Sequence, residues 1–457
     1  MPVILLLYFG VMRITNNIKT ANGFLLISSL FFYSWGEPRW FVLLLIIATS
    51  DYFIGKKILI ASDRSIRKRL LITSVSFDLG VLFIFKYLGF TISTINRLLR
   101  TSIKQPYIAL PIGISFFIFQ SLSYIFDITS NKVKSPEKYL NYLLYVGMFP
   151  QLVAGPIIRY SDISNQLLHR YTSLPEFCQG IKRFCVGLGK KIILANSFGV
   201  AVVVLFGGDL SELSMLAAWL GALFFAFQIY FDFSGYSDMA IGLGRMFGFA
   251  YKENFNYPYV SSSVTEFWRR WHISLGSFFR DYVYIPLGGN QHNQIRNIFI
   301  VWFLTGLWHG ASWNFVLWGL YFGALLFMEK WVRSKNVFAP KSISWPITMI
   351  LVLYGWGIFY FTDSTKLMQF SRSFFGMEEL YDSQYLKVIT IFYENIWLLL
   401  IGVIAATPIP RALYHKYVAP KRIVTIFWNL FITSMLLAVC FIFLVGESYN
   451  PFLYFRF

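Results

Sequence analysis

Long apolar runs recur along almost the whole of this 457-residue sequence, and they constrain its fold more than any other feature. Only 14% of the residues are charged, whereas a soluble globular domain carries roughly 25%. The mean hydropathy is +0.57, and 20% of the residues are aromatic. These values exclude a disordered chain and an ordinary soluble enzyme. They indicate a polytopic membrane protein, whose length suits roughly ten to twelve spanning helices.

The apolar runs are expected to be helices, because an open strand cannot satisfy its backbone hydrogen bonds in lipid. They do not alternate residue by residue, as the strands of a membrane barrel would. The expected helices lie near residues 22–36, 39–60, 70–93, 108–128, 139–154, 178–206, 213–231, 295–312, 313–332, 344–362, 388–406 and 423–446. We therefore predict an all-α membrane protein with a single integral-membrane domain over residues 1–457.

Basic residues outnumber acidic residues by 40 to 22, which gives a formal charge of +18. They lie in short clusters between the apolar runs, as in the loop 56–69. Such clusters are typical of cytoplasmic loops that meet anionic lipid, and they disfavour a nucleic-acid-binding protein. We expect the loop 56–69 in the cytoplasm, although the next loop, with Arg97 and Arg100, is basic as well.

Three stretches interrupt the apolar pattern. Residues 155–177 are amphipathic and suit a helix on the membrane surface. Residues 232–248 contain two Asp and four Gly, and residues 252–292 are polar yet rich in aromatic side chains. Irregular backbone at membrane depth is tolerated only where it is buried in protein or lines a cavity. We therefore predict that residues 232–292 form a re-entrant region lining a tunnel, beside functional helices over 295–332.

His309 is the strongest single candidate for chemistry. It lies in an uncharged apolar run, where an ionisable side chain is costly and usually faces a cavity or a site. Tryptophans surround it in the sequence at positions 302, 308, 313 and 318, and Gly306 and Gly310 leave room for close approach. The alternative is a buried neutral histidine bonded to a helix carbonyl, and the sequence leaves these two interpretations close in weight.

His272 lies in a second notable stretch, which mixes aromatic and charged residues. In isolation this stretch predicts an interfacial amphipathic helix with snorkelling arginines. The functional interpretation is an anion-recognising surface, since Arg makes bidentate contacts with phosphate or carboxylate. The phosphates of a coenzyme A donor would suit such a surface. The charged residues concerned are Arg269, Arg270, Arg280 and Asp281.

Asp232 and Asp238 are spaced so that they would not share a face of an ideal helix, and Gly235 between them makes an ideal helix doubtful. Two interpretations carry equal weight: the carboxylates support a polar cavity, or they cap helices at a break. Surface or interface positions are expected for the other histidines, which are His169, His292 and His415.

Several chemistries have no motif in this sequence. There is no GxxxxGK[ST] phosphate loop, no HExxH zinc motif and no GxSxG nucleophile elbow. The three cysteines lack the spacing of metal ligands. We therefore predict neither a metal site nor a bound cofactor.

Seven sequence blocks are specific when taken together, although the tripeptide WHG alone would be weak. They are LFFYSWGEP, FPQLVAGPIIRY, QIYFDFSGYSDMAIGLGRMFGF, WRRWHISL, RDYVYIPLGGN, LTGLWHGASWNFVLWGLYFG and NPFLYFRF. These blocks, spread over nearly the whole chain, resemble the membrane-bound O-acyltransferase (MBOAT) superfamily. Within it they resemble the bacterial branch that contains the membrane subunit of alginate O-acetyltransferase. The resemblance implies a ring of tilted transmembrane helices around a central tunnel.

The same resemblance implies roles for individual residues. His309 is similar to the superfamily's catalytic histidine, and His272 falls on a second marked position, which is Asn, Asp or His across the superfamily. The family's first hydrophobic segment is usually longer than Pro2 to Met12, which indicates a trimmed start. The further residues expected to bind the donor or line the tunnel are Trp308, Asn314, Trp268, Arg269, Arg270, Arg280, Asp281, Asp232 and Asp238.

The function implied by the resemblance is that of an O-acetyltransferase of the bacterial cytoplasmic membrane. Cytoplasmic acetyl-CoA would be the donor substrate, and hydroxyls of a cell-envelope or exopolysaccharide would receive the acetyl group, directly or through an extracytoplasmic partner protein. The IPLGGN block favours this acetyl branch over relatives that D-alanylate teichoic acids from a carrier-protein thioester.

Acyl transfer to a hydroxyl needs a base and stabilisation of the carbonyl oxygen. An imidazole, with a reference pKa of about 6.5, suits the base. We expect His309 to deprotonate the acceptor or, as a variant, to form an acyl-histidine intermediate. Two other classes remain open from the residues themselves, a membrane transporter or lipid flippase and a scaffold in which the histidines are structural.

Overall fold

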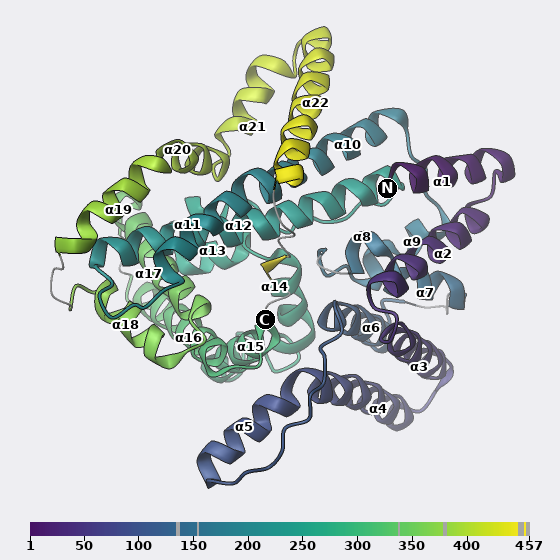
Figure 1. Cartoon of the computed structure of the whole chain (residues 1–457). Coiled ribbons are helices and arrows are strands. Elements are labelled where there is room, and N and C mark those ends of the chain that lie inside the picture. Colours follow the sequence, from purple (N-terminus) through teal and green to yellow (C-terminus); the bar gives the residue numbers. More distant parts are fainter. Residues whose placement is uncertain (134–137, 153–154, 337–338, 378–381, 447–451, 454–457) are drawn as a thin grey trace. The chain divides into compact units, whose positions relative to one another are not determined.

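The structure is a computed structural model that describes residues 1–133, 138–152, 155–336, 339–377, 382–446 and 452–453. Within these ranges every regular element is a helix, which confirms the predicted all-α class. The chain forms two compact units (Figure 1). Unit 1 comprises Met1–Ile181 and Ala240–Lys252, and unit 2 comprises Lys182–Met239 and Glu253–Phe457.

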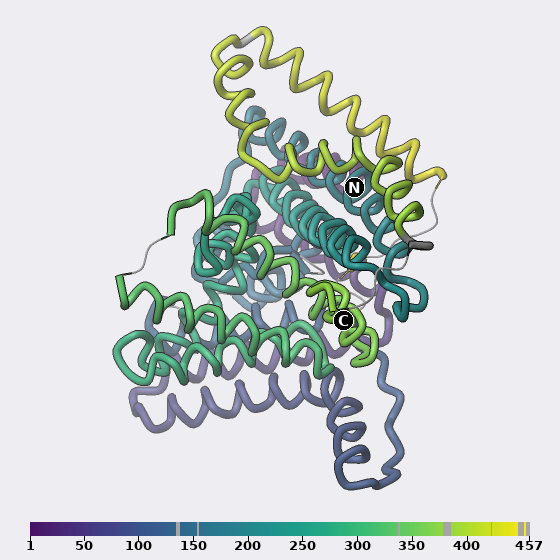
Figure 2. Tube along the Cα trace, turned by 90° about the vertical axis from the view of Figure 1, so that its left-hand side faces the viewer, coloured from purple at the N-terminus to yellow at the C-terminus, as the bar shows by residue number. Residues whose placement is uncertain are grey.

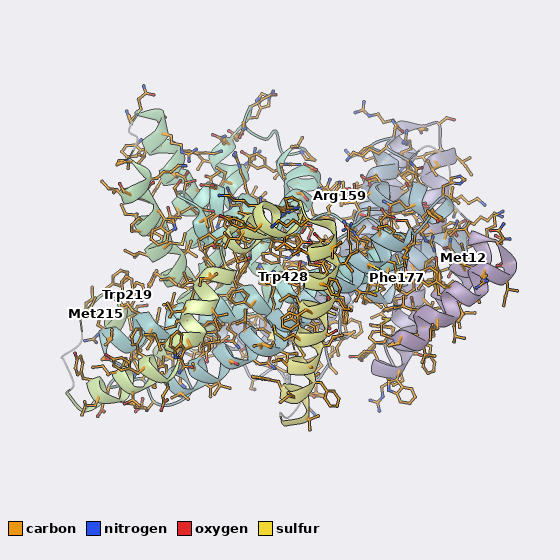
Figure 3. The ribbon with its side chains drawn as sticks, turned by 90° about the horizontal axis from the view of Figure 1, so that it is seen from above. Met12, Arg159, Phe177, Met215, Trp219 and Trp428 are labelled. Atoms are coloured by element: carbon orange, nitrogen blue, oxygen red, sulfur yellow. The ribbon has the colours of Figure 1, made fainter. Side chains whose placement is uncertain are left out.

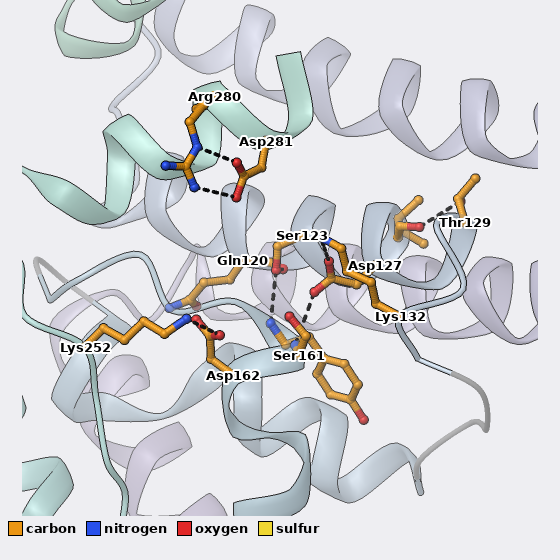
Figure 4. A network of polar contacts seen from close by, with 12 residues as sticks. Gln120, Ser123, Asp127, Thr129, Lys132, Ser161, Asp162, Lys252, Arg280 and Asp281 are labelled. Atoms are coloured by element: carbon orange, nitrogen blue, oxygen red, sulfur yellow. Dashed lines mark hydrogen bonds and ion pairs between the residues drawn. The ribbon is translucent and has the colours of Figure 1, made fainter. Parts of the chain in front are cut away.

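Unit 1 contains the N-terminal helices and the last turns of α12. Its helices are α1 (Pro2–Thr15), α2 (Ile18–Gly36), α3 (Phe41–Ile60), α4 (Arg64–Leu82), η1 (Phe83–Tyr87), α5 (Leu88–Leu99), α6 (Ile114–Thr129), α7 (Tyr139–Gly147), α8 (Phe149–Leu152), α9 (Tyr160–Leu168) and the first half of α10 (Leu174–Gly189). Polar contacts join segments that are distant in the sequence. Asp127 accepts a hydrogen bond from the Ser161 N–H at 3.2 Å, and Lys252 pairs with Asp162 (Figure 4).

Only the first part of the predicted surface segment 155–177 packs into the interior of unit 1, because residues 155–158 are buried whereas residues 174–176 are exposed. Only α9 and the start of α10 are helical there. Tyr160, Ile163 and Leu167 are fully buried, and the Tyr160 ring packs edge-on against Tyr124 at 4.9 Å. The amphipathic pattern is present, but protein rather than lipid covers its apolar face. The apolar face of α9 thus packs on protein, and the position of the segment 155–177 at the membrane surface stays a prediction.

Unit 2 contains the two histidines of interest. Its helices are the end of α10, η2 (Lys190–Ala195), α11 (Asn196–Phe206), α12 (Met215–Met246) up to Met239, η3 (Pro258–Val260), α13 (Val264–Arg270), α14 (Ile273–Phe279), η4 (Arg280–Tyr284), α15 (Gln294–His309), α16 (Trp313–Ser334), α17 (Lys341–Tyr360), α18 (Ser364–Phe374), α19 (Asp382–Glu394), α20 (Ile396–Ala405), α21 (Ile409–Leu413), η5 (Tyr414–Val418) and α22 (Arg422–Gly446). Aromatic side chains dominate its core, where Trp271, Trp318 and Trp356 are almost completely buried.

The helix α12 contradicts the interpretation that Asp232 and Asp238 cap helices at a break. It runs without interruption through Asp232 and Asp238, so neither residue caps a helix. Its Gly235 instead permits close packing, because a Cβ there would lie 2.7 Å from the carbonyl oxygen of Gly187 in α10. The predicted re-entrant region 232–292 therefore begins with a continuous helix, and its irregular part starts after Met246.

Six helices of the described chain are long and apolar enough to cross a membrane, and the bent pair α19 and α20 would add a seventh. Two of the six are α16 and α17. Shorter apolar helices such as α1 and α6 account for part of the difference from the predicted ten to twelve. The chain is thus a multi-pass membrane protein by length and composition of its helices.

The helices α15 and α16 form a tightly packed pair joined by a short connection (Figure 2). Gly306 and Gly319 make this approach possible, since their Cα atoms face each other across the pair. A Cβ on Gly306 would lie 2.2 Å from the Phe315 carbonyl oxygen, and one on Gly319 would lie 2.2 Å from that of Trp302. Small residues therefore fix the backbone that carries His309.

An apolar cavity of about 360 Å³ lies elsewhere in unit 2, between α12, α17 and α19. Trp219, near the start of α12 (Figure 3), stacks on Phe374 at 4.5 Å and donates its indole N–H to the Phe374 carbonyl. None of the residues predicted for the site lines this cavity. Its lining is Leu216, Trp219, Leu220, Leu223, Leu353, Val388, Ile389 and Phe392.

Candidate active site

His309 is the last residue of α15 and is only 4% exposed. Its ring meets three aromatic rings edge-on, those of Trp308 and Trp318 at 5.0 Å and that of Phe359 at 5.3 Å. The predicted tryptophan surroundings are thus partly present, whereas Trp313 is 56% exposed. A buried imidazole at a helix end, enclosed by aromatic rings, is shielded from bulk water.

Asn314, at the start of α16, fixes one wall of this enclosure. Its amide nitrogen donates to the carbonyls of Ile358 and Phe359 at 3.3 and 3.1 Å. Those carbonyls belong to the end of α17, so the bonds hold the Phe359 ring against His309. Asn314 is 5% exposed, and its Oδ1 has no partner among the described residues. Asn314 is thus a buried polar group that holds the end of α17, and its role in donor binding or in lining a tunnel stays a prediction.

His272 lies at the break between the short helices α13 and α14 and is 2% exposed. Its backbone has φ +44°, a left-handed conformation that is uncommon and strained for a residue other than glycine. The ring packs edge-on against Phe233 at 4.5 Å and lies 5.5 Å from the Trp308 ring. Trp308 therefore contacts both imidazoles, which places the two predicted histidines in one aromatic site.

Asn254 is a site residue that the sequence analysis missed. It is fully buried, and its Oδ1 lies 3.2 Å from His272 Nδ1 and 2.8 Å from the Ser274 hydroxyl. Backbone bonds on either side fasten the segment, because Asn256 N–H donates to Arg270 and Ile273 N–H donates to Asn254. A polar residue in a stretch rich in aromatics was the available signal, but no local spacing connects Asn254 with His272.

Burial lowers the pKa of His272, outside the spanning helices, to about 3, whereas an unfolded histidine titrates near 6.5. The folded protein therefore favours the neutral ring of His272. The folded state has the full benefit of this preference at pH values above the pKa of the unfolded chain, and it loses the benefit as the pH falls toward the pKa of the folded state. When the pH is lowered from 8 to 5, we expect the free energy of unfolding of the wild type to fall by about 2 kcal/mol more than that of His272→Gln. Melting temperatures of both proteins at the two pH values test this, and equal losses would contradict it.

The predicted arginine surface is largely neutralised by neighbouring carboxylates. Arg270 pairs with Glu266 at 2.9 Å, one turn earlier in α13. Arg280 pairs with its neighbour Asp281 at 2.7 Å (Figure 4), and this bond raises the pKa of Arg280. Arg269 is exposed and has no ion pair among the described residues. Of the three arginines, it has the charge most available to an anionic ligand.

Trp268 packs in a cluster of aromatic rings, one of which contacts His309, and does not belong to an exposed surface. Its ring lies 4.8 Å from those of Trp302 and Phe322 and 5.4 Å from that of Trp318, which itself contacts His309. The indole N–H of Trp268 is buried without a partner among the described residues. The residue therefore connects α13 with the α15 and α16 pair.

Asp232 and Asp238 form ion pairs with basic residues of α10 and η2. Asp232 bonds Lys191 at 2.7 Å and accepts the Leu453 N–H at 2.7 Å. Asp238 bonds Lys190 at 2.7 Å and Arg183 Nε at 2.8 Å. These basic partners were not predicted from the sequence, although their place inside the apolar run 178–206 was a signal that each needs a counter-charge.

Replacing Asp232 by alanine is expected to destabilise unit 2 by about 3–5 kcal/mol, because Lys191 would stay buried without its carboxylate. The double variant Asp232→Leu with Lys191→Met removes both charges and should recover most of the loss. Melting temperature in detergent measures both effects. A single variant as stable as wild type, or a double variant no better than the single one, would contradict the pairing.

Comparison with known proteins identifies the family. Residues 60–371 match the family model of MBOAT, the membrane-bound O-acyltransferase family. The chain is 36% identical to the probable alginate O-acetylase AlgI of Pseudomonas putida, over 100% of this chain and 98% of that protein. It is 41% identical to the corresponding protein of Pseudomonas aeruginosa, over 79% of this chain and 69% of that one.

The chain is also similar to a relative that is named for acetylation of peptidoglycan and not of alginate. The peptidoglycan O-acetyltransferase of Helicobacter pylori is 32% identical, over 82% of this chain and 78% of that protein. The family match and the acetyltransferase relatives agree with a multi-pass helical membrane protein. This chain therefore belongs to the membrane-bound O-acyltransferase family and is a membrane O-acyltransferase.

Proposed function

We propose that this protein is an O-acetyltransferase of the bacterial cytoplasmic membrane, with acetyl-CoA as its cytoplasmic donor. The acetyl group would pass to hydroxyls of a cell-envelope or exopolysaccharide, directly or through an extracytoplasmic partner protein. The observation that carries the proposal is the enclosed His309, in contact with Trp308, which also contacts His272. The acceptor class follows the relatives, which are named for alginate and peptidoglycan O-acetylation.

His309 is the proposed catalytic base. The acceptor hydroxyl gives its proton to the imidazole as its oxygen attacks the thioester carbonyl carbon. The C–S bond then breaks, and the imidazolium returns the proton to the departing thiolate, so the step needs no further reactant. The aromatic enclosure excludes water, which protects the thioester from hydrolysis and strengthens electrostatic interactions at the carbonyl oxygen.

The remaining predicted residues have supporting roles in this proposal. Asn314 and Trp268 shape the enclosure through the contacts described above. Arg269 is the exposed cation proposed to meet the phosphates of the donor. Asp232 and Asp238 hold α12 against its neighbouring helix through their ion pairs, rather than touching substrate.

The test uses purified protein in nanodiscs with radiolabelled acetyl-CoA and an envelope polysaccharide. Release of free thiol together with label on the polymer supports the proposal. If only a thioester on a carrier protein is consumed, the donor is wrong and a transfer of the D-alanylation type replaces it. Movement of intact substrate without thioester cleavage in proteoliposomes would instead establish a transporter.

The extracytoplasmic partner is tested by fractionation. Wild-type cells and cells lacking candidate secreted acetyltransferases are compared for ester content of the polymer. Label that reaches the polymer with purified membrane protein alone supports direct transfer. Label that requires a secreted protein, and first appears on that protein, supports transfer through a partner.

A further inference from the structure

We propose that Asn254 is a positioning residue that holds His272 in the tautomer protonated at Nδ1, so that Nε2 accepts a hydrogen bond from an N–H or O–H group of the substrates. The inference rests on the proposed function only for the identity of those substrates. The tautomer itself follows from the contacts of Asn254, His272 and Ser274, all of which lie in unit 2.

The hydrogen bonds of the Asn254 side chain fix the orientation of its amide group. Its oxygen faces the backbone N–H of Ser274 at 3.1 Å, which can only donate. Its nitrogen lies 3.0 Å from the Ser237 hydroxyl, which can accept. A flipped amide would direct its NH₂ group at the Ser274 N–H and leave two donors facing each other. The atom next to His272 is therefore the carbonyl oxygen Oδ1.

The contact with Asn254 fixes which ring nitrogen of His272 carries the proton. Asn254 Oδ1 only accepts, and it lies 3.2 Å from His272 Nδ1, so Nδ1 must carry the hydrogen. The Ser274 hydroxyl does not replace this donor, because its single proton points to Asn254 at 2.8 Å rather than to Nδ1 at 3.4 Å. In a neutral imidazole the other nitrogen, Nε2, then carries a lone pair.

The other ring nitrogen of His272, Nε2, lies in an apolar environment. It is buried and has no hydrogen-bond partner among the described residues, while the edge of Phe233 and the ring of Trp308 cover the imidazole. A buried acceptor without a partner is destabilising, and a substrate N–H or O–H would remove this penalty on binding. Burial also lowers the pKa of His272 to about 3, so the ring stays neutral at working pH.

This assignment has a mechanistic consequence. A neutral ring protonated only at Nδ1 cannot donate from Nε2, so His272 does not stabilise the carbonyl oxygen of the tetrahedral intermediate. It orients a substrate instead. The group it binds is either an amide N–H of a pantetheine-type donor arm or a hydroxyl of the acceptor, and substrate kinetics separate these two sources.

The tautomer is tested directly by ¹⁵N NMR of protein labelled at its 5 histidines. The His272 signals are assigned by their loss in His272→Gln. We expect a neutral ring protonated at Nδ1 in wild type and in Asn254→Asp, which keeps an acceptor oxygen. A mixture of tautomers is expected in Asn254→Ala. A wild-type ring protonated at Nε2, or charged at neutral pH, overturns the proposal whether or not the protein shows acetyl transfer.

Kinetics then test the positioning role. We expect Asn254→Ala to lower kcat/KM by about 10- to 100-fold and Asn254→Asp to restore a large part of it. Asn256→Ala is the matched control, because that side chain is exposed in the same segment. A raised KM for the donor identifies its amide as the bound group, and a raised KM for the acceptor identifies its hydroxyl. Unchanged kinetics in a folded Asn254→Ala protein overturns the role.

Discussion

Cells carrying His309→Ala should show acyl transfer reduced by about 100- to 10,000-fold, which is the range that a positioned general base contributes. The reason is that no other imidazole can take the place of this ring at the end of α15, where Trp308, Trp318 and Phe359 enclose it. The measurement is the ester content of the isolated envelope polymer, together with thiol release by the purified protein.

Two controls make the His309 result interpretable. His415→Ala removes an exposed histidine outside the candidate site and should leave transfer unchanged. His309→Gln keeps a polar side chain of similar size, and its melting temperature shows whether the fold is intact. A well-folded His309→Ala protein that transfers at the wild-type rate would remove His309 from the mechanism and favour the scaffold interpretation.

The substitution Gly306→Val is expected to cost about 3 kcal/mol and to reduce the yield of folded protein. A Cβ at this position would lie 2.2 Å from the Phe315 carbonyl oxygen, and a backbone atom cannot move aside as a flexible side chain can. The two helices would have to separate, and His309, one turn further along α15, would move with them. Melting temperature and thiol release should therefore fall together.

Gly208→Val is the matched control for this effect. A Cβ at Gly208 meets nothing within 4 Å, and the residue is exposed in the same unit. It should melt close to wild type. A stable and active Gly306→Val protein would show that the close approach of α15 and α16 is not required for the site.

The helical class and the two histidines could be predicted from the sequence because both depend on local pattern. Apolar runs of spanning length and an ionisable residue inside one of them are visible without any long-range contact. Around Gly235 the sequence left two interpretations open, and the one in which Asp232 and Asp238 cap helices at a break is wrong. In the structure Gly235 permits α12 to pack against the backbone at Gly187, and a single sequence does not distinguish close packing from a helix break.

Asn254 and the partners of Asp232 and Asp238 could not be assigned from the sequence for a different reason. Each depends on a contact between segments, as when Lys191 bonds Asp232 across two packed helices. The arginines of α13 and η4 were recognised in the sequence as a possible anion-binding surface. In the structure, ion pairs with carboxylates neutralise Arg270 and Arg280. Local composition identified the charges, and only the fold identified what each charge faces.

The most direct test of the central claim follows the acetyl group itself. Wild type and His309→Ala are reconstituted in nanodiscs with acetyl-CoA carrying a labelled acetyl group, acceptor polysaccharide and the secreted fraction of the producing cells. The account predicts label in ester linkage on the polymer with wild type and none above background with the variant. Equal labelling by the two proteins, with both shown to be folded, would contradict it.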